Sequence, residues 1–298
     1  MTLATEDDED DEDAEDAEDV RLADEAYAEV LAGVRVYTHE EVVAMLGLDE
    51  EKPVPEGGSA RVGIVSDVHG DAPALDQALA RLRAMGISLI LCAGDLLDVE
   101  PFGEEVCQRL KGEGIVTIRG NHERWALERR RRRPDPRLTS QGCDLAEPAD
   151  LFGGGAELSR PALAWLRTLP DHWTAELAGV QVAMWHARPG SDMRGIEADK
   201  TGPELRRQLL DRAGADVLIV GHTHEAFRLA TSDGRLIVNP GACCSKLPAR
   251  TDESSAGGPH RAGTFAVLEL PKKIFRVFRA ADGERIRVLG TTVPAKRG

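Results

Sequence analysis

Polar residues able to bind metal ions follow five short apolar stretches of the sequence. The set combines carboxylates, imidazoles and one carboxamide, and it contains five of the chain's eight histidines. Its members are Asp67, His69, Asp95, Asp98, Asn121, His122, His186, His222 and His224. Mixed nitrogen and oxygen donors of this kind favour Mn²⁺, Fe, Zn²⁺ or Ni²⁺ over Ca²⁺ or Cu(I). The residue types therefore indicate a transition-metal site.

Each motif taken alone is weak. Asp67-Val-His69 has the composition of a surface turn, and the Gly-Asn pair before His122 is common in tight turns because both residues tolerate positive φ. A histidine pair separated by one residue, such as His222 and His224, is often simply exposed. The five motifs together are a stronger signal than any one of them, because all five groups follow predicted strands. No cysteine is among them, which argues against a structural zinc site of the cysteine type.

The elements around these residues predict an α/β domain. Short strands are expected at 62–65, 87–91 and 115–118, and helices with one apolar side at 72–85 and 102–111. Alternating strands and helices imply βαβ units with parallel pairing. Ligands bind beyond the carboxyl ends of such strands, which is where the polar residues lie.

After residue 160 the pattern indicates more antiparallel pairing. A hairpin is expected from 174–178 and 181–185 around Gly179, followed by a helix at 203–212 and a strand at 216–220. Further strands are expected at 226–231, 235–238, 264–269 and 274–279.

The N-terminal part has a different composition. Residues 1–19 contain twelve acidic residues and no basic one, so subtracting these charges from the net −15 leaves −3 for the rest of the chain. Such a segment cannot bury apolar surface, and we expect it to be disordered. Residues 20–59 read as a helical extension that ends in a Pro- and Gly-rich linker. The main domain is then 60–298, with an inserted loop or cap at 133–160.

Composition excludes several functional classes. The near-neutral main domain makes nucleic acid an unlikely partner, and no apolar run approaches the ~18 residues of a membrane span. The acidic N-terminus does not resemble a signal peptide, so a cytoplasmic location is expected. Five cysteines without a C-x-x-C spacing indicate reduced, buried thiols. The oligomeric state is open.

The order D-x-H, G-D-x-x-D, G-N-H-E, H and G-H-x-H is similar to that of the calcineurin-like metallophosphoesterase superfamily. The resemblance runs from about Arg61 to Phe278, and residues 67–75 and 238–242 resemble its small bacterial and archaeal phosphodiesterase branch. It implies a four-layer αββα sandwich of two mixed β-sheets flanked by helices. It also implies two divalent metal ions above the central strands, with Mn²⁺ the first choice.

The resemblance implies seven metal ligands. One ion would be held by Asp67, His69 and His224. The other would be held by Asn121, His186 and His222. Asp95 would bridge the two ions.

The same resemblance gives His122 a catalytic role without metal binding. It would stand near the leaving-group or phosphoryl oxygens and, if protonated, donate a proton to the leaving oxygen. Asp98 would orient a neighbouring ligand. The two ions would hold a bridging hydroxide that attacks phosphorus in line. The expected activity is hydrolysis of phosphomonoesters or phosphodiesters.

Other functions stay open at this point. Asp71 stands where the branch often has Asn, and Ala242 where it often has Ser. Val-Glu follows Asp98, whereas Ser/Thr protein phosphatases and diadenosine tetraphosphatases typically have Arg-Gly there. This difference argues against two alternative functions, a protein phosphatase and a dinucleoside polyphosphate hydrolase. A binding module that has kept the fold without catalysis should lack ligands, and none is missing here. The arginine run 129–133 is either a solvated helix end or an anion-recognition patch.

Overall fold

The structure is a computed structural model of the chain and describes residues 58–98, 100–131, 158–245 and 263–290. The acidic tail, nearly all of the N-terminal extension and linker, and most of the predicted insertion lie outside these residues, as do Cys143 and the side chains of the arginine run 129–133. The predictions for those segments stay predictions. No helix in the described ranges is long and apolar enough to cross a membrane.

The first of two six-stranded sheets has the order β11-β10-β9-β1-β2-β3. One half is parallel and consists of β1 (Ala60–Val65), β2 (Leu89–Cys92) and β3 (Val116–Thr117). The other half is antiparallel and consists of β9 (Thr264–Leu270), β10 (Ile274–Arg279) and β11 (Arg285–Ile286). The predicted βαβ units therefore make up the parallel half.

The second sheet has the order β12-β7-β8-β6-β5-β4 and is also mixed. Its parallel centre consists of β5 (Val180–Trp185), β6 (Val217–Ile219) and β8 (Leu236–Asn239). The remaining strands are β4 (His172–Leu177), β7 (Phe227–Ala230) and β12 (Leu289–Gly290). The predicted hairpin around Gly179 is the pair β4 and β5.

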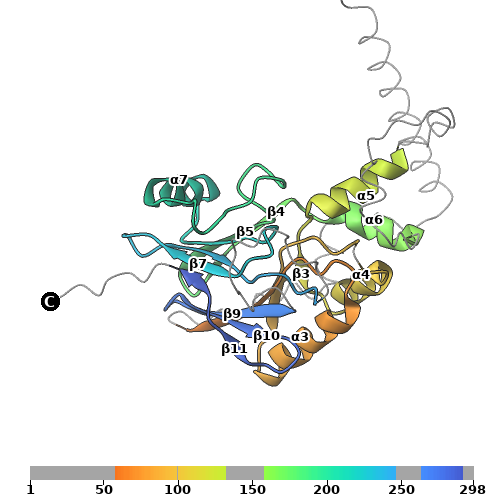
Figure 1. Cartoon of the computed structure of the whole chain (residues 1–298), viewed down its shortest axis with the longest axis horizontal. Coiled ribbons are helices and arrows are strands. Elements are labelled where there is room, and N and C mark those ends of the chain that lie inside the picture. Colours follow the sequence, from red (N-terminus) through yellow and green to blue (C-terminus); the bar gives the residue numbers. More distant parts are fainter. Residues whose placement is uncertain (1–57, 99, 132–157, 246–262, 291–298) are drawn as a thin grey trace, which may run out of the picture. The chain divides into compact units, whose positions relative to one another are not determined.

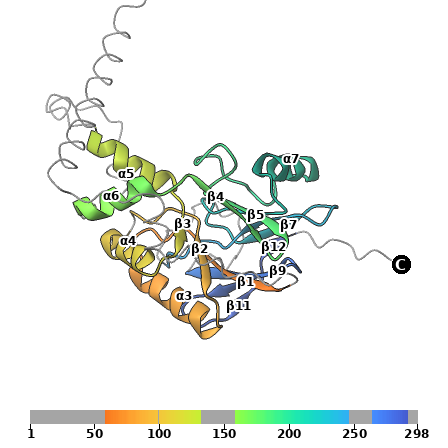
Figure 2. The same ribbon diagram turned by 180° about the vertical axis from the view of Figure 1, so that it is seen from behind.

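Helices cover the outer face of each sheet. On the first sheet lie α3 (Ala72–Ala84), α4 (Gly103–Gly112), α5 (Asn121–Arg131) and α6 (Arg160–Thr168). On the second sheet lies α7 (Pro203–Ala213). Figures 1 and 2 show these two groups of helices on opposite sides of the paired sheets.

Strand periodicity explains the three buried layers between these elements. Along β6, Val217 and Ile219 face the core between the two sheets, whereas Leu218 faces α7. Along β1, Val62 and Ile64 likewise face the second sheet. Successive side chains of a strand point to opposite faces, so a strand buried on both faces reads as a continuous apolar run. The four-layer αββα sandwich is confirmed.

Two helices were not predicted, α5 and α6. α5 begins at Asn121, inside a motif whose Gly and Asn indicate a turn, although the following residues are mostly good helix formers. α6 begins where the predicted insertion ends, and Ser159 caps it by accepting a hydrogen bond from the amide of Ala162 at 3.2 Å. Pro161 lies in the first turn, where proline is common, and could have indicated the start of this helix in the sequence.

Candidate metal centre

Five strand ends bring the sequence-predicted residues together. Two groups follow β1 and β2, a third begins α5 just after β3, and the last two follow β5 and β6 of the second sheet. All five strands run parallel to a neighbour, so their carboxyl ends deliver side chains to one place. Asp67, His69, Asp95, Asn121, His122 and His186 are buried, whereas His222 and His224 are half-buried.

The backbone at these residues is strained. Eight non-glycine residues have positive φ in the described chain, and six of them are polar residues of this site. They are Asp67, His69, Asp95, Asp98, His222 and His224, with φ between 49° and 69°. Left-handed conformations cost of order 1–3 kcal/mol each and persist where the surrounding structure enforces them. Such a concentration is typical of a site in which side-chain direction matters more than stability.

Side-chain donors form two groups that could each hold a metal ion. The first group consists of Asp67, His69, Asp95 and His224. The second consists of Asp95, His186 and His222. Within each group one atom per residue lies within 4.8 Å of all the others. Asp95 belongs to both groups, and the grouping coincides with the two ligand sets that the family resemblance implies.

Asn121 completes the second group. Its Oδ1 lies 3.1 Å from His186 Nε2 and 2.9 Å from His222 Nδ1. The amide oxygen therefore points to the same place as the imidazole nitrogens. All seven predicted ligands are thus brought together.

Two histidines have their tautomer set by backbone carbonyls. His69 Nδ1 donates to Leu97 O at 3.1 Å, and His186 Nδ1 donates to Ala93 O at 2.7 Å. In each neutral ring, Nε2 is then an unprotonated lone pair. This is the arrangement by which proteins orient histidine ligands.

Each Nε2 faces another possible metal-binding atom. His69 Nε2 lies 3.0 Å from His224 Nε2, and His186 Nε2 lies 3.1 Å from Asp95 Oδ2. Each close pair must share either a proton, which a neutral His224 can itself donate, or a metal ion. The residues present therefore fit a metal ion at each group.

Electrostatics at the second group support this reading. Burial alone would lower the pKa of His186, but the charge and hydrogen bond of Asp95 raise it to about 10. Burial alone would raise the pKa of Asp95, but His186 and the other nearby histidines lower it well below its usual range. The buried carboxylate thus stays ionised because positive charge sits beside it, and a bound metal ion can replace that positive charge.

His122 lies beside the first group without belonging to it. Its ring centre is 4.7 Å from that of His69, and its Nε2 is 3.8 Å from Asp95 Oδ2. Its Nδ1 donates to Asp98 Oδ2 at 2.7 Å. Burial lowers the pKa of His122, but the Asp98 hydrogen bond and the charge of Asp95 raise it above the usual value. Asp98 was expected to orient a metal ligand, and its contact is instead with His122.

Glu123 is a residue of this site to which the sequence assigned no role. It is fully buried, and its carboxylate accepts hydrogen bonds from the amides of Asp95, Leu96 and Gly120 at 2.7 to 2.9 Å. Burial and the nearby charge of Asp95 raise the pKa of Glu123 to about 7. The side chain ties the loop after β2 to the start of α5 and so sets the position of Asp95.

We expect Glu123→Gln to lower the free energy of unfolding of the metal-free protein by about 1–3 kcal/mol. The carboxamide has one acceptor oxygen, so its NH₂ group must face one of the three backbone amides. Urea unfolding measures the change. Glu128→Gln, on the same helix but in an exposed pair with Arg124, is the control and should cost less. Equal stabilities of the two variants would contradict this role for Glu123.

Two further features hold the loops in place. Asn239 is fully buried at the end of β8, and its Nδ2 donates to Gly221 O at 2.8 Å and to Thr223 Oγ1 at 3.1 Å, which positions the loop of His222. Gly120 leaves space for Asp95, because a Cβ there would lie 2.1 Å from Asp95 Oδ1. The glycine of the G-N-H-E motif thus has a steric reason.

Comparisons with known proteins agree with this architecture. The family model of the calcineurin-like phosphoesterase superfamily domain matches residues 61–273. An uncharacterized protein of Methanocaldococcus jannaschii is 22% identical over 192 residues, which cover 60% of this chain and 68% of that protein.

Two solved structures share the fold. A metallophosphoesterase from Sphaerobacter thermophilus is 20% identical, with a TM-score of 0.52 over 78% of this chain and 89% of that one. A hypothetical protein from Pyrococcus horikoshii is 18% identical, with a TM-score of 0.59 over 74% of this chain and 87% of that one. With a family match over most of its length, the chain belongs to the calcineurin-like phosphoesterase superfamily.

Proposed function

We propose that this protein is a metal-dependent hydrolase of phosphomonoesters or phosphodiesters with a dinuclear metal site. One observation carries the proposal: imidazole nitrogens and carboxylate oxygens converge in two groups that share Asp95. The donor set is mixed nitrogen and oxygen, which suits Mn²⁺, with Fe, Zn²⁺ or Ni²⁺ as further candidates. Asp67, His69 and His224 would hold one ion, and Asn121, His186 and His222 the other.

Bound there, two divalent ions would supply Lewis acidity and lower the pKa of a water held between them. The protein's own groups do the rest. Asp95 presents one carboxylate oxygen to the amide of His122 and the other to His186, so its orientation is fixed from two sides. His122, whose pKa the Asp98 hydrogen bond raises, would donate its Nε2 proton to the leaving oxygen.

A cavity next to His186 offers room for a phosphoester. It has a volume of about 400 Å³ and is lined by Arg119, Arg124 and Trp185 among others. Arg119 pairs with Asp171, and Arg124 pairs with Asp192 and Glu128, so these cations are partly neutralised. A cavity of this size can accommodate a low-molecular-weight phosphoester, which makes that substrate class the first to test.

Metal removal and replacement test this proposal. Protein treated with a chelator should lose hydrolysis of p-nitrophenyl phosphate and of bis-p-nitrophenyl phosphate, and Mn²⁺ should restore it at up to two ions per chain. The two esters separate monoesterase from diesterase activity. A phosphopeptide and a dinucleoside polyphosphate, tested in parallel, address the two alternative enzymes. Binding of two ions without hydrolysis of any ester would instead support a binding module that has kept the fold.

A further inference from the structure

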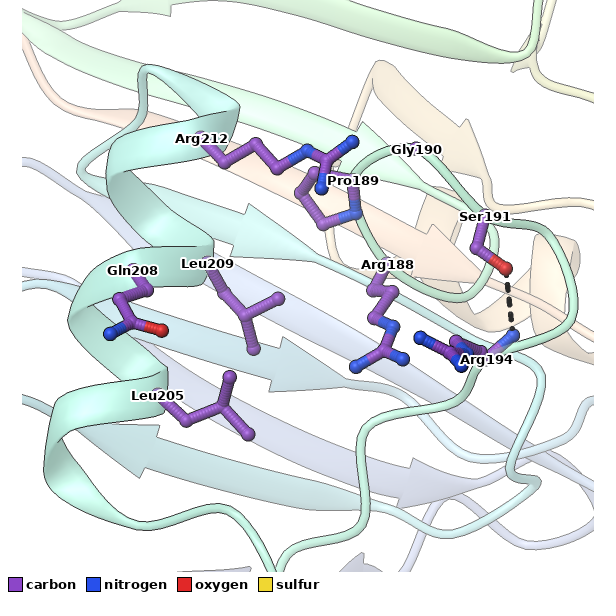
Figure 3. Close-up of a pocket in the computed structure, with 9 residues that line it drawn as sticks. All are labelled: Arg188, Pro189, Gly190, Ser191, Arg194, Leu205, Gln208, Leu209 and Arg212. Carbon is purple, nitrogen blue, oxygen red and sulfur yellow. Dashed lines mark hydrogen bonds between the residues drawn. The ribbon is translucent and has the colours of Figure 1, made fainter.

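A second cavity lies beside the metal centre, between α7 and the loop that follows His186. Its volume is about 470 Å³. It shares Gly190 and Ser191 with the cavity that contains His186, so the two cavities have a common wall. Figure 3 shows its lining, and three of the nine lining residues are arginines: Arg188, Arg194 and Arg212. We call it the arginine pocket.

These three arginines are not neutralised within the described chain. Their guanidinium groups have no hydrogen bond or ion pair with any described residue. Several other arginines of the described chain pair with carboxylates, as Arg119 does with Asp171 and Arg235 with Asp211. Positive charge around one cavity, without a carboxylate partner in the described chain, indicates a site for an anion.

The two walls carry five acidic residues, and none of them lines the pocket. Four have a basic partner outside the pocket, and the fifth is Asp199. The pairs are Asp192 with Arg124, Glu197 with Lys200, Glu204 with Arg207, and Asp211 with Arg235. The pocket's positive charge is therefore available to a ligand.

The loop wall is held in a fixed shape. Arg188 and Ser191 exchange two backbone hydrogen bonds, at 3.1 and 2.9 Å, around the turn residues Pro189 and Gly190. Ser191 Oγ also accepts from the amide of Arg194 at 3.0 Å, drawn as the dashed line in Figure 3. A rigid wall keeps the entropic cost of ordering the arginines low when a ligand binds.

Gly190 gives Arg212 its place over this turn. Its φ is +82°, and a Cβ there would lie 2.3 Å from Arg212 Nη2. The guanidinium of Arg212 therefore lies directly against the turn that carries Arg188. Side chains from the helix and from the loop thus line the same cavity (Figure 3).

The helix wall adds an apolar surface. Leu205, Gln208, Leu209 and Arg212 have the spacing of one face of α7. Leu205, Leu209 and Arg212 point toward the loop (Figure 3). Leu205 and the nearby Met193 are two of the three large apolar side chains exposed in the described part of the chain. A ligand with an anionic end and a short apolar portion matches this combination.

We propose that the arginine pocket binds a second, non-reacting phosphoryl group of the substrate. Guanidinium groups present paired N–H donors that match phosphate oxygens, and three of them line this pocket. The substrate class is then a phosphoester with a further phosphate on a partly apolar body. This inference rests on the proposed function, which places the reacting phosphoryl group at the metal centre.

Calorimetry with alkyl phosphonates tests the inference without any turnover. The Mn²⁺-loaded protein is titrated with methylene-, propylene-, pentylene- and octylene-bisphosphonate, and with the alkylmonophosphonate of each chain length. Two linked anions can occupy both sites at once, so at least one length should bind on the order of tenfold or more tightly than its monophosphonate. The length with the greatest advantage reports the separation of the two sites.

Arg194→Gln and Arg212→Gln should remove this advantage and leave the affinity for monophosphonates unchanged. Both side chains are exposed and distant in sequence from the proposed ligands, so we expect folded proteins, which thermal unfolding checks. Arg207→Gln is the matched control, because Arg207 is on α7 but pairs with Glu204 and does not line the pocket. The control should keep the full advantage.

The outcomes separate the two proposals. Bisphosphonates that bind the two arginine variants as tightly as the wild type would overturn the arginine pocket, as would the lack of an advantage at every length. Monophosphonates whose binding does not depend on Mn²⁺, together with no ester hydrolysis, would instead overturn the metal centre. The arginine dependence of bisphosphonate binding is measurable in either case.

Discussion

Asp95→Asn is expected to reduce hydrolysis by roughly 10²-fold or more and to lower the bound metal by at least one ion per chain. Asp95 is the one residue that belongs to both donor groups, and it is 1% exposed. The substitution removes a buried negative charge while nearly preserving shape. The amide oxygen can still accept from the backbone of His122, but the NH₂ group would then face the Nε2 lone pair of His186.

Elemental analysis and steady-state kinetics measure these two effects on the same preparation. Asp76→Asn is the matched control, because this carboxylate is exposed on α3 and pairs with Arg109. It should keep wild-type metal content and activity. Thermal unfolding of the metal-free proteins excludes global unfolding as the cause. Full activity of Asp95→Asn with unchanged metal content would contradict the proposed bridge.

The sequence was sufficient to predict the parallel strands and their polar ends. Apolar runs such as 62–65 and 216–220 mark buried strands, and the topology of α/β sheets places their carboxyl ends together. The predicted ligands therefore fell into one site even though Asp67 and His224 are 157 residues apart in numbering. The strand pattern and the sheet topology together predict that these distant residues lie close in space, without knowledge of any individual contact.

Other parts of the site depend on tertiary contacts that a single sequence does not encode locally. Glu123 follows His122 in a motif, but only the fold shows that its carboxylate binds backbone amides of another loop. Asp98 was placed near a ligand, and the structure shows it on His122 instead. The carbonyls of Ala93 and Leu97 fix histidine tautomers. Every residue has a backbone carbonyl, so the residue type does not indicate this role.

The arginine pocket could not be predicted from the sequence for a different reason. Arg188, Arg194 and Arg212 are spread over a loop and a helix, and single arginines are common on surfaces. Their relation appears only when α7 is folded against the loop after β5 (Figure 3). The consecutive run 129–133 is more conspicuous in the sequence, but it lies outside the described side chains.

His122→Asn should reduce hydrolysis most for esters with poor leaving groups. A protonated His122 would donate to the departing oxygen, a contribution of typically ~10²–10⁴-fold. Phenyl phosphate releases a phenol with a pKa near ~10, as in tyrosine, and needs that proton. p-Nitrophenyl phosphate releases a far weaker base and should lose much less. The metal content of the variant should equal that of the wild type, because His122 is in neither donor group.

Asp98→Asn provides the second test of the same role. Its carboxylate accepts from His122 Nδ1 at 2.7 Å and helps to raise the pKa of that ring. The amide can keep the hydrogen bond but not the charge, so we expect a smaller loss with the same leaving-group pattern. The double variant should be hardly worse than His122→Asn alone, because the two residues act as a unit. An equal loss for phenyl and p-nitrophenyl esters would instead assign His122 to the phosphoryl oxygens, where its charge would act in every substrate alike.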